Sequence, residues 1–291
     1  MIDAHTVLIL GAGASKPYGF PLGTELRHQI LSMLSGEANP DFKTLSALGH
    51  TPVAINQFRD DLHDALHNTI DDFLSDRPTH RVIGAQAIII ALINCEKHTS
   101  LFPKRDWYPR LVQILDFRHG NQLLEGIVTL NYDRSLEHYM SNTVSVSYEG
   151  AVKKFAMERL GEFPIYHIHG MLGEYPLRPY HAKAEIEDIK KAADDLRITS
   201  DGDLDKSANY QAARKLCEQA KTVVFLGFGY HDSVISRLGL SEPLSTRKLL
   251  GTAHGLTAKR KKEVEELFKG QIVLDPTNRP VASYFEEVLM Q

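Results

Sequence analysis

Short apolar runs recur along the chain, and most are followed by a segment whose apolar positions repeat at helical spacing. Residues 7–10 are all apolar and stop at Gly11, a pattern typical of a buried parallel strand. Residues 24–34 then place leucine and isoleucine side chains on one side of a helix. Together they predict the opening strand, loop and helix of a dinucleotide-binding fold. Further strands are predicted at residues 126–130, 163–169, 222–226, 247–253 and 271–274.

Residues 37–120 have a different pattern. Proline, asparagine and glycine interrupt residues 37–56, and helical periodicity follows over 58–74, 81–95 and 107–117. No strand-like run occurs where a simple Rossmann domain has its second strand. We therefore predict a mainly helical insertion over residues 37–120.

The rest of the chain completes an α/β pattern. A second helical insertion is expected over residues 180–220, and a small hairpin over 144–155. Helices are predicted at residues 257–268 and 282–289. Because strands alternate with helices, we predict a single Rossmann-like α/β domain over residues 1–291, with a largely parallel sheet and helices on both faces.

Composition limits the classes of function. The chain has 291 residues, of which 43% are hydrophobic and 24% charged, as expected of a soluble globular protein. A formal net charge of -4 argues against a broad nucleic-acid interface. The first residues lack a signal-peptide pattern, and the longest apolar run, residues 83–93, is too short to span a bilayer. We therefore expect a cytoplasmic protein without membrane or direct nucleic-acid contacts.

Glycines follow the first predicted strand. Ligands of open parallel sheets bind beyond the carboxyl ends of strands, so the residues there are candidates for chemistry. The run from Gly11 to Ser15, Gly-Ala-Gly-Ala-Ser, would let backbone N–H groups approach a pyrophosphate. The third glycine of the dinucleotide fingerprint is replaced by Lys16, and no Walker A ending is present. A tight turn after a core strand is the alternative explanation.

The next strand end carries Thr129, Asn131 and Asp133, which share one side if the strand persists. The amide of Asn131 can donate and accept hydrogen bonds, and could therefore orient a ribose or a water. Asp133 is also a favourable N-cap for a helix that begins at Arg134. The two roles are compatible.

Two histidines, His167 and His169, lie on one side of the following strand. A histidine at a strand end is suited to general-base catalysis near neutral pH. A hydrogen-bonded structural histidine and a metal-binding pair are the alternatives, and no third ligand is evident nearby in sequence. After the strand at residues 222–226, Gly227 and Gly229 either admit part of a nucleotide or form a plain turn.

The order of these motifs resembles the sirtuin superfamily. The sequence contains Gly-Ala-Gly-x-Ser, Gly-x-Pro, Thr-x-Asn-x-Asp, His-Gly and a late Gly-x-Gly, beginning at Gly11, Gly19, Thr129, His169 and Gly227. Three further features resemble the bacterial SIR2-like branch, which includes NAD-consuming effectors of anti-phage defence. They are the Asn-Tyr-Asp form, the segment around residues 70–74, and the Gly-Tyr-x-Asp that ends at Asp232.

The resemblance implies a role for each motif. The loop after the first strand would hold the NAD phosphates, Asn131 would lie beside the nicotinamide ribose, and His169 would be the catalytic base. Asp133 would support this pocket, and the late glycines would line the adenosine side. The residues implied to bind NAD are Gly11, Ala12, Gly13, Ser15, Pro21, Asp133, Gly227, Gly229 and Asp232.

The chain departs from the protein-deacylating sirtuins in its cysteines. Those enzymes carry a four-cysteine zinc module after the His-Gly motif, whereas this chain has only Cys95 and Cys217. The resemblance therefore implies an NAD glycohydrolase that uses NAD as its substrate and needs no metal. A homo-oligomer or an operon-encoded regulatory protein is the implied partner. The alternatives are an NAD- or ADP-ribose-binding sensor or scaffold, and a deacylase or ADP-ribosyltransferase.

Overall fold

The centre of the protein is an open parallel sheet. The computed structural model describes residues 2, 4–102, 106–119, 123–181, 183–198, 201–202, 204–242, 244 and 246–290. Within them six strands pair in the order β3-β2-β1-β4-β5-β6, and each of these pairings is parallel. The strands are β1 (Thr6–Leu10), β2 (Gly126–Thr129), β3 (Ile165–His167), β4 (Thr222–Leu226), β5 (Lys248–Gly251) and β6 (Ile272–Leu274). The predicted Rossmann-like α/β fold is confirmed.

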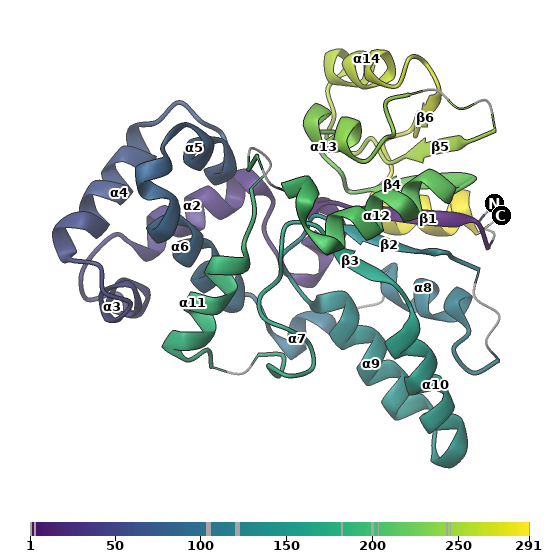
Figure 1. Ribbon diagram of the computed structural model, residues 1–291, viewed down its shortest axis with the longest axis horizontal. Coiled ribbons are helices and arrows are strands. Elements are labelled where there is room, and N and C mark those ends of the chain that lie inside the picture. Colours follow the sequence, from purple (N-terminus) through teal and green to yellow (C-terminus); the bar gives the residue numbers. More distant parts are fainter. Residues whose placement is uncertain are drawn as a thin grey trace.

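The central strands β1 and β4 are buried at every residue, which explains their unbroken apolar sequences. They pair with Leu10 opposite Leu226. The strand order reverses between them, and open α/β sheets bind ligands in the crevice beyond such a point. In Figure 1, β1 runs from the N-terminus at the right toward a group of helices at the left, so the carboxyl ends of the strands face those helices.

The described residues between β1 and β2 form helices and turns. Three of the helices, α3, α4 and α5, begin after a capping side chain that accepts a backbone N–H, provided by Asn39, Thr51 and Thr69. The single helix predicted over 58–74 is instead two, with a break after Asp64, and the predicted boundary at residue 120 lies outside the described residues. The helices are α1 (Ala12–Ser15), η1 (Lys16–Tyr18), α2 (Gly23–Met33), α3 (Pro40–Ala47), α4 (Pro52–Asp64), α5 (Ile70–Asp76), η2 (Pro78–His80), α6 (Arg81–Ile93), α7 (His98–Leu101) and α8 (Tyr108–Leu115).

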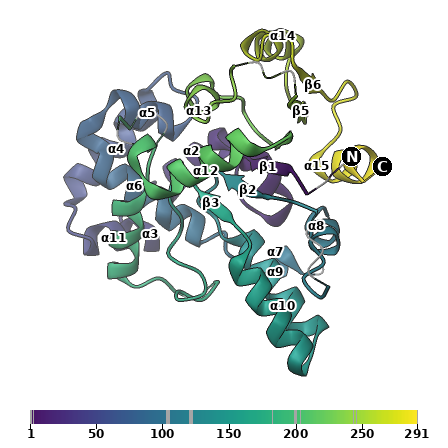
Figure 2. The same ribbon diagram turned by 45° about the vertical axis from the view of Figure 1, so that its right-hand side comes forward.

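The hairpin predicted over residues 144–155 is wrong. Two helices, α9 (Ser135–Ser147) and α10 (Gly150–Glu162), occupy this part of the chain. Leu136, Met140 and Val144 are buried at intervals of four residues, so packing on a helical period overrides the β-propensity of the local valines. In Figures 1 and 2 the two helices lie side by side and extend away from the sheet.

The remaining helices cover the sheet and extend the helical region. Helix α11 packs against α6, so part of the second predicted insertion joins the first (Figure 1). One core cluster contains Leu8 of β1 and the helices between β1 and β2, and another contains Val7 of β1 and helix α12. The helices that follow β3 are α11 (Ile186–Asp195), η3 (Leu204–Lys206), α12 (Ala208–Gln219), α13 (Asp232–Arg237), α14 (Ala258–Leu267), α15 (Val281–Tyr284) and the π-helical η4 (Phe285–Leu289).

Candidate active site

The loops after β1 and β4 contact each other through their glycines. The N–H of Gly11 donates to the carbonyl of Leu226 over 3.0 Å, and the N–H of Gly13 donates to the carbonyl of Gly227 over 2.9 Å. A Cβ atom on Gly13 would lie 2.8 Å from Cα of Gly227, which itself has a φ of +58°. The contact between the loops therefore requires these glycines, as in the tight-turn alternative.

Asn131 lies against the loop after β1. Its Nδ2 donates to the carbonyl of Gly11 over 3.0 Å and to Oγ of Ser15 over 2.9 Å. The pairing of β2 with β1 brings the residues that follow Thr129 to this loop. Among the described residues, Oδ1 of Asn131 receives no hydrogen bond, so it can accept one from a ribose hydroxyl or a water.

Asp133 is buried at the start of α9. Its Oδ1 accepts hydrogen bonds from the backbone N–H of Ser135, over 3.0 Å, and from the hydroxyl of the same residue. Burial raises the pKa of Asp133, and hydrogen bonds from Ser135 and Ser15 oppose that rise. The predicted N-cap is displaced by one residue: Arg134 occupies that position, and Asp133 still receives the first N–H of the helix.

His167 forms hydrogen bonds through both ring nitrogens. Nδ1 lies 2.9 Å from the carbonyl oxygen of Asn131, and Nε2 lies 2.5 Å from Oε1 of Glu137. A carbonyl oxygen only accepts, so Nδ1 carries a proton. Burial opposes the charged ring, but the Glu137 carboxylate, the Asn131 carbonyl and the charge of Asp133 together raise the pKa of His167. Both ring nitrogens are engaged in hydrogen bonds, so neither is available to take a proton.

His169 has the opposite environment. It is 6% exposed, and its Nε2 is buried without a hydrogen-bond partner among the described residues. Burial lowers the pKa of His169 to about 4, and the nearby charges of His231 and Arg237 act in the same direction. The ring is neutral at pH 7 and retains a nitrogen lone pair.

A second polar cluster surrounds His169, and sequence analysis missed it. The ring of Tyr132 is centred 6.3 Å from the ring of His169. The Tyr132 hydroxyl lies 3.1 Å from Oδ1 of Asp71 and 3.0 Å from the carbonyl oxygen of Arg197. The strand-end rule could not find Asp71, because it lies in the first turn of helix α5. The only indication in the sequence was the family resemblance of residues 70–74.

The two predicted catalytic residues lie in adjacent clusters. Asn131 contacts Ser15 and His167, whereas His169 contacts Tyr132, the residue that follows Asn131 in the chain. No hydrogen bond joins Asn131 to His169 within the described part of the chain. Neighbouring backbone positions after β2 thus connect the two clusters.

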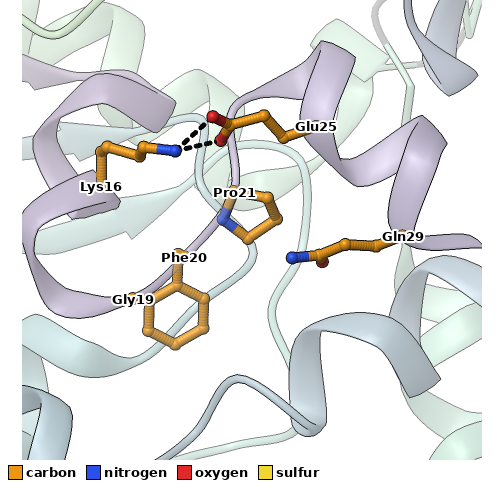
Figure 3. A pocket seen from close by; sticks show the side chains of 6 residues that line it. All are labelled: Lys16, Gly19, Phe20, Pro21, Glu25 and Gln29. Atoms are coloured by element: carbon orange, nitrogen blue, oxygen red, sulfur yellow. Dashed lines mark hydrogen bonds and ion pairs between the residues drawn. The ribbon is translucent and has the colours of Figure 1, made fainter.

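Two cavities lie near the predicted motifs. A cavity of about 10 Å³, enough for about one water, is lined by Ser15, Asn131, Asp133, Glu137 and His167, among others. A wider cavity of about 360 Å³ opens between η1 and α2. Figure 3 shows Pro21 on its wall and the ion pair between Lys16 and Glu25 at its edge. Pro21 therefore lines a different cavity from Asn131.

Gly229 and Asp232 are both exposed and lie where the chain passes from β4 into α13. A Cβ atom on Gly229 would lie 3.1 Å from Nε2 of His231, so the histidine ring folds back over this glycine. Asp232 is the first residue of α13, and its Oδ1 lies 3.7 Å from the guanidinium of Arg260.

The described residues contain no group of three or more His, Cys, Asp or Glu side chains that could hold a metal ion. No helix that they form is both long and apolar enough to cross a membrane.

Residues 125–265 match the family model of the SIR2-like domain. The chain contains a SIR2-like domain. The matched region includes strands β2 to β5 with Asn131, His169 and Gly227, whereas the loop after β1 and the helices up to α8 precede it. No curated protein matches the chain. The SIR2-like domain connects the chain with the sirtuin superfamily and with an NAD-related function.

Proposed function

We propose that the protein is an NAD glycohydrolase, which cleaves the nicotinamide–ribose bond and releases nicotinamide and ADP-ribose. The observation that carries this proposal is the imidazole of His169. It follows β3 within the SIR2-like domain, and its buried Nε2 has no partner among the described residues. A buried polar atom without a partner destabilises the fold, so it is expected where a ligand supplies the missing hydrogen bond.

His169 would accept the proton that the reaction releases. The electron pair of the C–N bond leaves with nicotinamide, which becomes neutral and needs no acid. Water adds to the anomeric carbon of the ribose, and one of its protons passes to Nε2 of His169. Such general-base assistance is typically worth about 10²–10⁴-fold in rate. His167 is unsuited to this role, because both of its nitrogens are hydrogen bonded.

Asn131 would orient the ribose or the attacking water through its unpaired Oδ1. The amide cannot replace the base, because it does not take a proton near pH 7. Ser15 and Glu137 support this assignment indirectly. Ser15 holds Nδ2 of Asn131, and Glu137 binds the His167 ring that contacts the Asn131 carbonyl.

Oδ1 of Asn131 and Nε2 of His169 have no hydrogen-bond partner among the described residues. These two acceptors suit the hydroxyl groups of the nicotinamide ribose better than the pyrophosphate, which needs donors. The N–H groups of Gly11 and Gly13 are bound to carbonyls of the β4 loop. We therefore assign these two glycines, with Gly227, to shaping the crevice. Ala12, Ser15, Gly229 and Asp232 stay proposed contacts for the phosphates and adenosine, because they follow the carboxyl ends of β1 and β4. Asp133 stays a proposed part of the pocket wall beside Asn131, and Pro21 stays a proposed NAD contact from the neighbouring cavity.

We further propose that the enzyme is a regulated cytoplasmic effector of bacterial anti-phage defence. The support is the resemblance of the Asn-Tyr-Asp and Gly-Tyr-x-Asp motifs, which end at Asp133 and Asp232, to SIR2-like effectors. Uncontrolled NAD cleavage would harm the cell, so activation by self-association or by an operon-encoded protein accompanies this role.

The proposal is tested by incubating the purified protein with NAD, alone and with the products of neighbouring genes, and resolving the products by chromatography. Nicotinamide and ADP-ribose in equal amounts are expected, without any acceptor protein. Stable NAD binding without nicotinamide would support the sensor or scaffold alternative. Nicotinamide release that requires an acylated or acceptor protein would support a deacylase or transferase.

A further inference from the structure

Helix α5 brings a carboxylate from the helical region to the His169 cluster. Asp71 lies in the first turn of α5, behind the capping residue Thr69. Its Oδ1 accepts from the hydroxyl of Tyr132 over 3.1 Å. The SIR2-like match begins at residue 125, so Asp71 comes from a part of the chain outside it.

The carboxylate of Asp71 is partly buried and accepts one hydrogen bond, from Tyr132. Burial raises its pKa, and the Tyr132 hydrogen bond and the charges of His231 and Arg81 only partly oppose that rise. In the described part of the chain no cation forms an ion pair with Asp71, and its Oδ2 receives no hydrogen bond. A partly buried carboxylate that accepts one hydrogen bond and pairs with no cation among the described residues is a candidate for function.

Four elements contribute to the polar cluster that contains Asp71. Asp71 comes from α5, Tyr132 from the segment after β2, His169 from the segment after β3 and His231 from the segment before α13. The Tyr132 side chain connects Asp71 with His169. Its hydroxyl donates to Asp71, and its ring lies beside the ring of His169. His231 acts electrostatically on both Asp71 and His169. Asp71 itself is only partly buried, so a ligand can reach its carboxylate.

We propose that Asp71 is a further catalytic residue, whose carboxylate faces the ribose and stabilises the positive charge that develops there. This role rests on the proposed NAD cleavage. When the C–N bond breaks, its electron pair goes to the nicotinamide nitrogen and the ribose ring becomes cationic. The fixed negative charge of Asp71 stabilises that cation until the oxygen of water bonds to the anomeric carbon and His169 takes the water's proton. The carboxylate forms no covalent bond and ends the cycle unchanged.

The test compares Asp71→Asn with Asp72→Asn. The asparagine keeps the size of Asp71 and the acceptor for Tyr132 but removes the charge. Asp72 is the exposed next residue of the same helix, and an asparagine there retains the acceptor for the Thr69 hydroxyl. Turnover of NAD, NAD affinity by calorimetry and the melting temperature are measured for both variants and the wild type.

Asp71→Asn is expected to lower kcat by about 100-fold or more, because loss of one fixed electrostatic contact commonly has that effect. NAD affinity should change by less than about tenfold, since the charge acts most strongly in the transition state. Asp72→Asn should match the wild type. If Asp71→Asn does not fold, Asp71→Ser provides the same test with a smaller neutral side chain.

Wild-type turnover together with full turnover by the neutral variants would overturn the role of Asp71 and leave the proposed function intact. A wild type that releases no nicotinamide, with or without its gene neighbours, would instead overturn the proposed function and this role with it.

Discussion

Gly13 and Gly227 lie back to back where the loops after β1 and β4 meet, and the N–H of Gly13 donates to the carbonyl of Gly227 over 2.9 Å. In the sequence the first of these glycines indicates a phosphate-binding loop. The structure explains the glycine by packing within the protein, because a Cβ atom on Gly13 would lie 2.8 Å from Cα of Gly227. The same contact holds together the two loops that border the crevice, at the point where the strand order reverses.

Gly13→Ala is therefore expected to destabilise the protein in the absence of NAD. The added methyl group meets backbone rather than a flexible side chain, and overpacking of this kind typically costs about 1–3 kcal/mol. The free energy of unfolding is measured by denaturant titration without ligand. Gly36→Ala is the matched control, because nothing lies within 4 Å of its Cβ position. Equal stability of the two variants would show that the loops can separate without cost.

Glu137→Gln should destabilise the protein by about 1.5–3 kcal/mol, because it removes a charge-assisted hydrogen bond to the buried ring of His167. The folded-state pKa of His167 is raised, so this contribution is complete below its unfolded pKa of about 6.5 and disappears as the pH rises through the folded value. The gap between wild type and variant should thus be wider at pH 6 than at pH 9. Exposed Glu187→Gln is the control and should show no such trend. A gap independent of pH would contradict the raised pKa of His167.

The pH profile of kcat/KM distinguishes the two histidines. His169 must be neutral to act, and burial lowers its pKa to about 4, so activity should be flat from about pH 6 to 8 and fall only in more acidic solution. Asp71 must be ionised and also contributes to an acidic limb. His167, with a raised pKa, would instead cause activity to fall from about neutral pH downward. A loss of activity between pH 8 and 6 that persists in Asp71→Asn would point to His167 as the base.

Nicotinamide release should survive treatment with a strong chelator. The proposed route uses a proton acceptor and fixed charges and needs no Lewis acid. Activity is compared before chelation, after it, and after addition of zinc. Loss on chelation with recovery on zinc would show that a metal takes part in the reaction.

The parts of the fold that the sequence predicts best are those with one dominant physical cause. The strands β1 and β4 are buried on both faces, so their apolar runs are unambiguous. The α9–α10 pair was mistaken for a hairpin because valine and threonine favour strands locally, whereas long-range packing of Leu136 and Met140 selects a helix.

The candidate site was predictable only where it follows strands. Asn131 follows β2 and His169 follows β3, so the strand pattern in the sequence indicates that both lie at the carboxyl edge of the sheet. It could not show that Asn131 and His169 fall in separate clusters, because the direction of each side chain depends on neighbours such as Ser15 and Tyr132. Asp71 reaches the site through tertiary packing of α5, which no local pattern encodes.

The most direct test of the account is nicotinamide release from NAD by the wild type, His169→Ala and His28→Ala. His28 is an exposed residue of α2 and serves as the control for removing an imidazole. The account predicts release by the wild type and by His28→Ala, and a rate at least about 100-fold lower for a folded His169→Ala. Release by His169→Ala at the wild-type rate, with an unchanged melting temperature, would contradict it.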